Sequence, residues 1–296
     1  MKVPSVGSGI GIVAAIVAAV MAVAPGSSAQ YGSGQPAQQQ QPQQPAKPGA
    51  QAPPAQHAEA PKKDPEEEKA YAAFFAVNAQ DNDKAIQLGE QFLQKYPTSS
   101  YRQSVYSRLT HAYYSKQPPQ VDKMYASADK AIELNPDDVS VLVLIGWMIP
   151  HSSNPNDLDA ERRLNKAEGY EKHALELLGT MPKPANLTDD QFAKAKAAVL
   201  LQAHEGLGLV YWRQQKFAES AAELQKAEKD NPEPDATDFY VTGIDFQQLK
   251  RYAEAADAFQ KCGQIAGGLQ DRCKQNADAA KKQAASQPAP PAPPKN

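Results

Sequence analysis

Residues 204–232 read HEGLGLVYWRQQKFAESAAELQKAEKDNP and contain two amphipathic segments joined by a polar turn at 213–216. In each segment, small, aromatic and apolar residues recur at helical spacing, and Pro232 ends the second segment. Each segment is too short to bury its apolar face alone, so the stretch predicts a helix–turn–helix unit that packs against neighbouring units. The inward positions are Leu207, Gly208 and Tyr211 in the first segment, and Phe217, Ser220, Leu224 and Ala227 in the second.

The order of these residues resembles the tetratricopeptide repeat, a helix pair with a period of about 34 residues. His204 stands at the first aromatic place and Ser220 at the first Ala place, which departs from the family pattern. The resemblance implies an all-α fold, a right-handed superhelical α-solenoid of helix pairs over residues 66–285. The expected units are 66–99, 103–136, 139–179, 201–234 and 236–267, followed by a capping helix at 268–285.

Three features of individual units are expected to affect the packing. In the first unit, Ala72 and Ala73 stand at the Leu-Gly places. In the third unit, a polar stretch at 150–165 interrupts the pattern. Before the fourth unit, Thr188 and Gln191 form a capping-box pattern, which predicts an unusually long first helix. The polar stretch at 150–165 and this long helix together form an irregular region. It is either a surface that a partner recognises or a tolerated insertion.

The N-terminal segment has the features of a secretory signal. Lys2 precedes an apolar run at 9–24, and small residues follow up to Ala29, so residues 1–29 are expected to be cleaved. An uncleaved membrane anchor is the alternative, but the run is shorter than the about 20 residues that a spanning helix needs. Since no cysteine lies near the cleavage site, the mature chain is expected to be periplasmic or secreted, without a stable membrane span.

Low-complexity sequence flanks the expected solenoid on both sides. Residues 30–65 are rich in Gln, Pro and Ala, and residues 286–296 are rich in Pro, so both are expected to be disordered. The formal net charge is −3 and no run of Lys or Arg is present. This charge distribution argues against nucleic acid as a partner.

The two cysteines of the chain, Cys262 and Cys273, lie on either side of the pair Gly267-Gly268. If the glycines form the corner of a helical hairpin, residues equidistant from the corner face each other. In an oxidising compartment this arrangement favours a disulfide. A pair of small buried thiols is the alternative.

Motifs that would indicate catalysis are incomplete. The pair His204-Glu205 lacks the second His of a zinc-binding helix, because Gly208 stands at that place. The other histidines are scattered, and none is paired with a Cys at ligand spacing. We therefore predict a protein that is not an enzyme and needs no cofactor or metal. A hydrolase or glycan-processing enzyme with a site in residues 150–186 is the alternative from another class. The scattered histidines are His57, His111, His151 and His173.

In the tetratricopeptide family, the first helix of each unit lines a concave groove that binds a partner polypeptide. The corresponding places in this sequence are mainly aromatic and apolar, and they largely lack the Lys and Asn with which some members clamp a terminal carboxylate. Such a groove suits an amphipathic or extended apolar peptide, with Trp147 and Trp212 as anchors. Packing between helices, or cover by the chain's own tether, is the alternative. The expected groove residues are Tyr71, Phe74, Arg108, His111, Tyr114, Leu144, Trp147, Leu209, Trp212, Arg213, Tyr240 and Ile244.

Taken together, the sequence predicts a non-catalytic, exported scaffold for protein–protein interaction that binds a peptide of unknown identity. An envelope-assembly or cell-wall-associated factor with the same repeats is the alternative within the binding class. In that alternative the Gln/Pro-rich segment spans distance, and cross-linking in cells would separate a soluble partner from an envelope complex.

Overall fold

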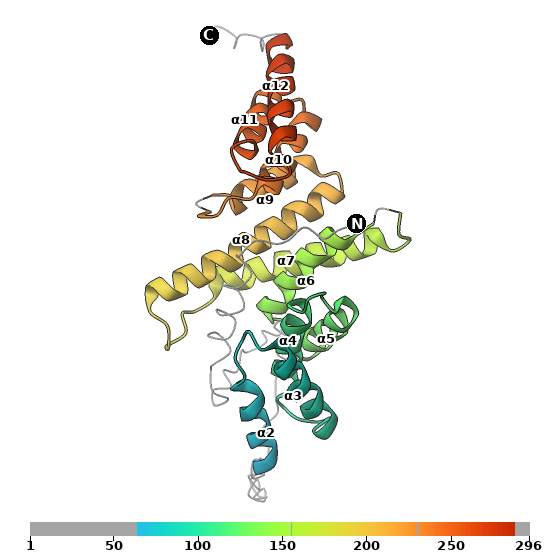
Figure 1. The fold of residues 1–296 in the computed structure, drawn as a ribbon, viewed down its shortest axis with the longest axis vertical. Coiled ribbons are helices and arrows are strands. Elements are labelled where there is room, and N and C mark those ends of the chain that lie inside the picture. Colours follow the sequence, from blue (N-terminus) through green and yellow to red (C-terminus); the bar gives the residue numbers. More distant parts are fainter. Residues whose placement is uncertain (1–63, 155, 230, 288–296) are drawn as a thin grey trace, which may run out of the picture.

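The computed structural model describes residues 64–154, 156–229 and 231–287. The expected signal peptide, nearly all of the expected tether and most of the Pro-rich tail lie outside the described residues. Within the described ranges every regular element is an α-helix, so the predicted all-α fold is confirmed (Figure 1). The helices are α2 (Pro65–Phe75), α3 (Asn82–Lys95), α4 (Arg102–Tyr114), α5 (Val121–Leu134), α6 (Val139–Ser152), α7 (Ala160–Thr180), α8 (Asp189–Arg213), α9 (Phe217–Ala227), α10 (Ala236–Gln248), α11 (Tyr252–Cys262) and α12 (Gln270–Ser286).

Helices adjacent in sequence pack against each other as five pairs, α2 with α3 through α10 with α11, and α12 packs on α11. The pairs follow one another along an elongated molecule, with α2 at one end and α12 at the other (Figure 1). Contacts between pairs are made by α3 with α4, α5 with α6, α7 with α8, and α9 with α10. This arrangement is a stack of helix pairs, the α-solenoid architecture that the sequence predicts.

Helix α8 has 25 residues and lies across the middle of the molecule (Figure 1). The Thr188 hydroxyl accepts a hydrogen bond from the backbone N–H of Gln191, and the Gln191 side chain accepts one from the Thr188 N–H. This capping box fixes the start of the helix, as the sequence predicts. The extended α8 packs against both helices of the preceding pair, α6 and α7.

The structure corrects the register of the first pair. Ala72 and Ala73 are exposed, whereas Ala70, Tyr71 and Phe74 pack against the core. The cause is the connection from α2 to α3, which spans residues 76–81 and is longer than the connection at 214–216 between α8 and α9. The additional residues shift the inward face of α2 relative to the family spacing.

The interruption after α6, the first helix of the third pair, is shorter than the sequence suggests. Helix α6 continues through Pro150 to Ser152, and α7 begins at Ala160. The loop between the two helices therefore consists of residues 153–159, and the first turns of α7 come from the stretch expected to interrupt the pattern.

Glycines let the two helices of a pair approach closely. A β-carbon on Gly208 would lie 2.7 Å from Cδ2 of Leu224, and one on Gly243 would lie 2.6 Å from Cδ1 of Phe259. Both distances are below van der Waals contact, so these positions accept only glycine without a shift of the neighbouring side chain. The apolar side chain of the second helix fills the space that the glycine leaves.

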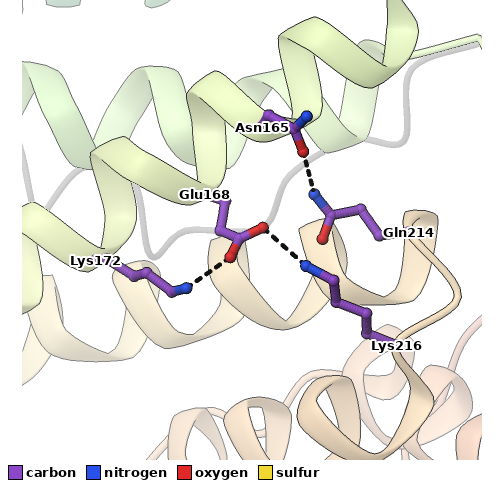
Figure 2. Close-up of polar contacts among 5 residues, drawn as sticks. All are labelled: Asn165, Glu168, Lys172, Gln214 and Lys216. Carbon is purple, nitrogen blue, oxygen red and sulfur yellow. Dashed lines mark hydrogen bonds and ion pairs between the residues drawn. The ribbon is translucent and has the colours of Figure 1, made fainter.

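A polar cluster joins the third and fourth pairs (Figure 2). Glu168 on α7 accepts hydrogen bonds from Nζ of Lys172 at 2.6 Å and from Nζ of Lys216 at 3.1 Å. Next to them, Nε2 of Gln214 donates to Oδ1 of Asn165 at 3.0 Å. Burial opposes ionisation of Glu168, but hydrogen bonds, including those from the two ammonium groups, lower its pKa to about 2. The cluster connects α7 with the turn between α8 and α9.

The C-terminal end is closed by a disulfide. Cys262, the last residue of α11, is joined to Cys273 near the start of α12, with the two Cα atoms 5.7 Å apart. Both cysteines are fully buried. The disulfide connects the last helix pair to the helix that covers it. Among the helices of the described ranges, none is long and apolar enough to cross a membrane.

Candidate functional site

Three of the expected groove residues lie in the core. Phe74, Leu144 and Leu209 are 0%, 4% and 6% exposed, respectively. They lie on first helices, as expected, but their side chains point into the packing between helices. We therefore correct the expected groove by leaving these three residues out of the surface that a partner would contact.

Three further expected groove residues, on α2 and α4, make contacts within the chain. The ring of Tyr71 stacks on Tyr101, with centroids 4.0 Å apart. The Arg108 guanidinium donates to the carbonyl oxygens of Phe74 and Phe75, both at 2.9 Å, and so stabilises the C-terminus of α2. His111 is 3.3 Å from the Ser140 hydroxyl, and burial lowers its pKa.

A line of rings connects α4 with the C-terminal half of α6. The rings of Tyr114 and Trp147 meet edge to face, with centroids 6.4 Å apart. His151, one turn after Trp147, lies 3.9 Å from the indole by ring centroids, and its Nδ1 is 2.7 Å from the Trp147 carbonyl oxygen. Tyr114 and Trp147 are each only partly buried, although the indole nitrogen of Trp147 is buried.

The line continues onto α8. Nε of Arg213 donates to the Pro150 carbonyl oxygen at 3.1 Å, which connects the C-terminus of α8 with that of α6. The same guanidinium lies over the Trp212 ring at 5.0 Å, and Trp212 packs beside Leu209. On α10, Tyr240 and Ile244 are also partly buried. We call the partly exposed set Tyr114, Trp147, His151, Glu205, Trp212 and Arg213 the aromatic face.

Glu205 is the acidic member of the aromatic face, and its side chain is 17% exposed. Its Oε1 lies 3.8 Å from Nε2 of His151, beyond hydrogen-bond distance. Burial raises the pKa of Glu205 to about 7, nearby Asp235 and Glu228 add to the rise, and the Trp147 indole opposes it. Burial also lowers the pKa of His151, so this pair is not a charged ion pair at neutral pH.

Further carboxylates surround the start of α10. Asp235 is the N-cap of α10 and accepts a hydrogen bond from the backbone N–H of Thr237. Asp238 is 1% exposed, and within the described ranges neither of its oxygens has a hydrogen-bond partner of normal geometry. Burial raises the pKa of Asp238, and Glu205, Asp235 and Glu228 raise it further. Several carboxyl groups therefore lie close together beside the aromatic face, and burial favours their protonated forms.

Glu171 on α7 is a second unusual acid, and it is fully buried. Its carboxyl group lies between Gly146 on α6 and Gly206 on α8, in contact with both. Among the residues that the structure describes, neither of its oxygens has a hydrogen-bond partner. Burial raises the pKa of Glu171 well above its usual value, and Glu205 contributes to the rise.

His151, Glu171 and Glu205 were not assigned to a site from the sequence, although their spacing relates each of them to residues of the predicted packing or groove. His151 follows Trp147 by four residues and Glu205 precedes Trp212 by seven, so each pair shares a helix face. Glu171 stands between Ala167 and Ala174 at the place that Leu224 takes in the fourth pair.

The arrangement suits binding by side-chain contact. In the parts of the chain that the structure describes, no three His, Cys, Asp or Glu side chains are placed to hold a metal ion. A cavity of about 160 Å³ lies between α9, α10 and α11, with Glu228, Thr242 and Lys261 among its lining residues. This volume is small for a ligand pocket and far too small for a polypeptide segment.

No protein-family profile matches the sequence, and no curated protein matches it significantly. Among solved structures, the fold is similar to that of PilW, described as a widely conserved type IV pilus biogenesis factor. The sequences are 16% identical, the match covers 75% of this chain and 92% of PilW, and the TM-score is 0.46. A tetratricopeptide repeat protein from Parabacteroides merdae ATCC 43184 is also similar, with 14% identity, 72% and 96% coverage and a TM-score of 0.25.

Proposed function

We propose that this chain is a non-catalytic, exported scaffold that binds a segment of a partner polypeptide along the first helices of its repeats. The observation that carries the proposal is the aromatic face. Tyr114, Trp147 and Trp212 are partly exposed, and they lie on the successive first helices α4, α6 and α8. Partly exposed aromatic side chains on rigid helices are typical anchors of protein interfaces.

The helix pairs support this role because they hold the face rigid. The hydrogen bond from Arg213 to the Pro150 carbonyl and the cluster around Glu168 fix α6, α7 and α8 relative to one another. A rigid binding face loses little conformational entropy when a partner binds. Export is supported by the sequence of residues 1–29 and remains part of the proposal.

The test uses peptides selected from a randomised 12-residue display library on the immobilised full-length chain. We expect Trp147→Ala and Trp212→Ala to weaken binding of the selected peptides by at least tenfold, about 1.4 kcal/mol. Tyr252→Ala, which truncates a partly buried aromatic residue on the second helix α11, is the matched control and should bind normally.

Circular dichroism separates a binding role from a structural one. All three variants should keep wild-type helicity and melt cooperatively. Peptides that bind the two Trp variants as tightly as the wild type would contradict the proposal. A variant that loses helicity would instead assign that Trp to the core, and Trp→Phe at the same position would then replace it in the binding measurement.

A further inference from the structure

We infer that Glu205, Tyr114 and Trp147 form a receptor for one cationic side chain, Lys or Arg, of the bound polypeptide. This inference rests on the proposed function and specifies what the partner must carry. Its basis is the position of one carboxylate beside two aromatic rings on a shared, partly exposed face.

The geometry provides the two elements of cation recognition in proteins. Tyr114 and Trp147 meet edge to face and present partly exposed rings, whose faces attract a cation. Oε1 of Glu205 lies 3.8 Å from Nε2 of His151, whose ring is 3.9 Å from that of Trp147 by centroids, so the carboxyl group lies beside the ring pair. A cation between these groups would contact the rings and the carboxylate together.

Within the described ranges, no Lys or Arg side chain forms an ion pair with Glu205. The Arg213 guanidinium donates to the Pro150 carbonyl oxygen and lies over the Trp212 ring. His151 is 3.8 Å from Glu205, and burial lowers the pKa of its ring, so it remains uncharged at neutral pH. Glu205 is therefore a carboxyl group removed from water without a cationic partner among the described residues that surround it.

A second observation concerns the acidic neighbours of Glu205. Asp238 is almost fully buried, interacts electrostatically with Glu205, and has no hydrogen-bond partner of normal geometry for either oxygen within the described ranges. Carboxylates that gather in a poorly solvated place repel one another. A ligand cation would relieve this repulsion, whereas an apolar or acidic ligand would not.

The binding is expected to be linked to protonation. Burial raises the pKa of Glu205 to about 7, and a bound cation favours the ionised form, so binding releases a proton near neutral pH. Affinity should therefore fall as pH falls below 7, by up to about tenfold per pH unit. The charged and titratable groups that face Glu205 are Tyr114 on α4, His151 on α6, Glu171 on α7, Glu228 after α9, and Asp235 and Asp238 at the start of α10, and Arg213 interacts electrostatically with His151.

The experiment measures affinities of peptides selected from the display library against the full-length chain. We expect the selected peptides to share a Lys or Arg, and its replacement by norleucine to weaken binding by at least tenfold, about 1.4 kcal/mol. Glu205→Gln should weaken binding of the Lys peptide to the same extent and leave binding of the norleucine peptide unchanged. Glu219→Gln removes an exposed carboxylate on α9 and is the matched control.

The possible outcomes separate this inference from the proposed function. Peptides that depend on Trp147 and Trp212 but lack a basic residue, or that bind Glu205→Gln normally, would overturn the inference and leave the proposed function standing. Failure to select any peptide that depends on the two Trp residues would overturn both. If Glu205→Gln does not fold, the pH dependence of wild-type affinity decides, because only the Lys peptide should lose affinity between pH 7.5 and 6.

Discussion

The carboxyl group of Glu171 on α7 lies against Gly146 on α6 so closely that a β-carbon at position 146 would be 2.5 Å from Oε1. In the fourth and fifth pairs the same place, opposite a glycine, is taken by Leu224 and Phe259. An acid thus replaces an apolar side chain at a central contact of the stack. Burying a polar group without a hydrogen bond is costly, so Glu171 should lower the stability of the fold.

Replacing Glu171 with Leu should stabilise the protein. The change removes a buried carboxyl group and introduces the side chain that fits the equivalent place beside Gly208. We expect a gain of about 1–3 kcal/mol in the free energy of unfolding, measured by chemical denaturation of the full-length chain. Glu176→Leu on the exposed side of α7 is the control and should change stability by less than about 0.5 kcal/mol. A loss of stability in Glu171→Leu would show that the carboxyl group has a stabilising partner.

Stability should also depend on pH through the same residue. Burial raises the pKa of Glu171 in the folded state, whereas an unfolded Glu has a pKa of about 4.3. Above that value the unfolded chain loses the proton that the folded chain retains, so this contribution to stability falls as pH rises toward the folded pKa. The slope is at most about 1.4 kcal/mol per pH unit.

Glu205 and Asp245, whose pKa values burial raises to about 7, should act in the same direction between pH 4.5 and 7. The measurement is the melting temperature of wild type and Glu171→Leu between pH 5 and 8. The stabilisation by the substitution should increase with pH across this range. A difference that stays constant with pH would contradict a raised pKa for Glu171.

Gly206 on α8 should not tolerate a side chain. A β-carbon there would collide with the Glu171 carboxyl group and lie 3.1 Å from the Trp147 Cα, which cannot move without a shift of α6. Gly206→Ala should therefore destabilise the protein by about 1–3 kcal/mol. Gly169→Ala on α7 is the matched control, because a β-carbon there meets nothing within 4 Å and should add up to about 1 kcal/mol through helix propensity. Equal stability of the two Ala variants would argue against close contact of α6, α7 and α8.

The disulfide between Cys262 and Cys273 should stabilise the C-terminal end. Closing so short a loop contributes about 2–3 kcal/mol by the chain-entropy estimate. Cys262→Ala/Cys273→Ala should lower the melting temperature under non-reducing conditions by several degrees, and reductant should lower that of the wild type in the same way. Two thiols that react with an alkylating agent in unfolded, non-reduced protein would rule out the bond.

Repetition made the fold predictable, because the spacing of small and apolar residues recurs in each helix pair. The long α8 followed from the capping box at Thr188, a purely local signal. The register of α2 was not predictable in this way, since it depends on the length of the connection at 76–81. The spacing of residues predicted which of them lie on first helices, but it did not show which side chains are buried. Phe74 is buried in the core, whereas Trp147 is partly exposed.

The charged part of the aromatic face was harder to predict because it depends on three-dimensional proximity. In the sequence, Glu205 belongs to an incomplete zinc-binding motif with His204. In the structure, it lies beside residues of α4, α6 and α10, which the sequence pattern does not indicate. Burial, which single-sequence patterns do not give for an acidic residue, raises its pKa to about 7. Glu171 was likewise hidden, because an acid in a second helix is ordinarily exposed.

The central claim is that a polypeptide lies along the first helices of the repeats. The most direct measurement is photo-cross-linking of a selected peptide to the full-length chain carrying p-benzoylphenylalanine either at Tyr240 on the first helix α10 or at Tyr252 on the second helix α11. Both side chains are aromatic and partly buried, so the two sites are comparable. The account predicts cross-links from position 240 and none from position 252, whereas cross-links from position 252 alone would contradict it.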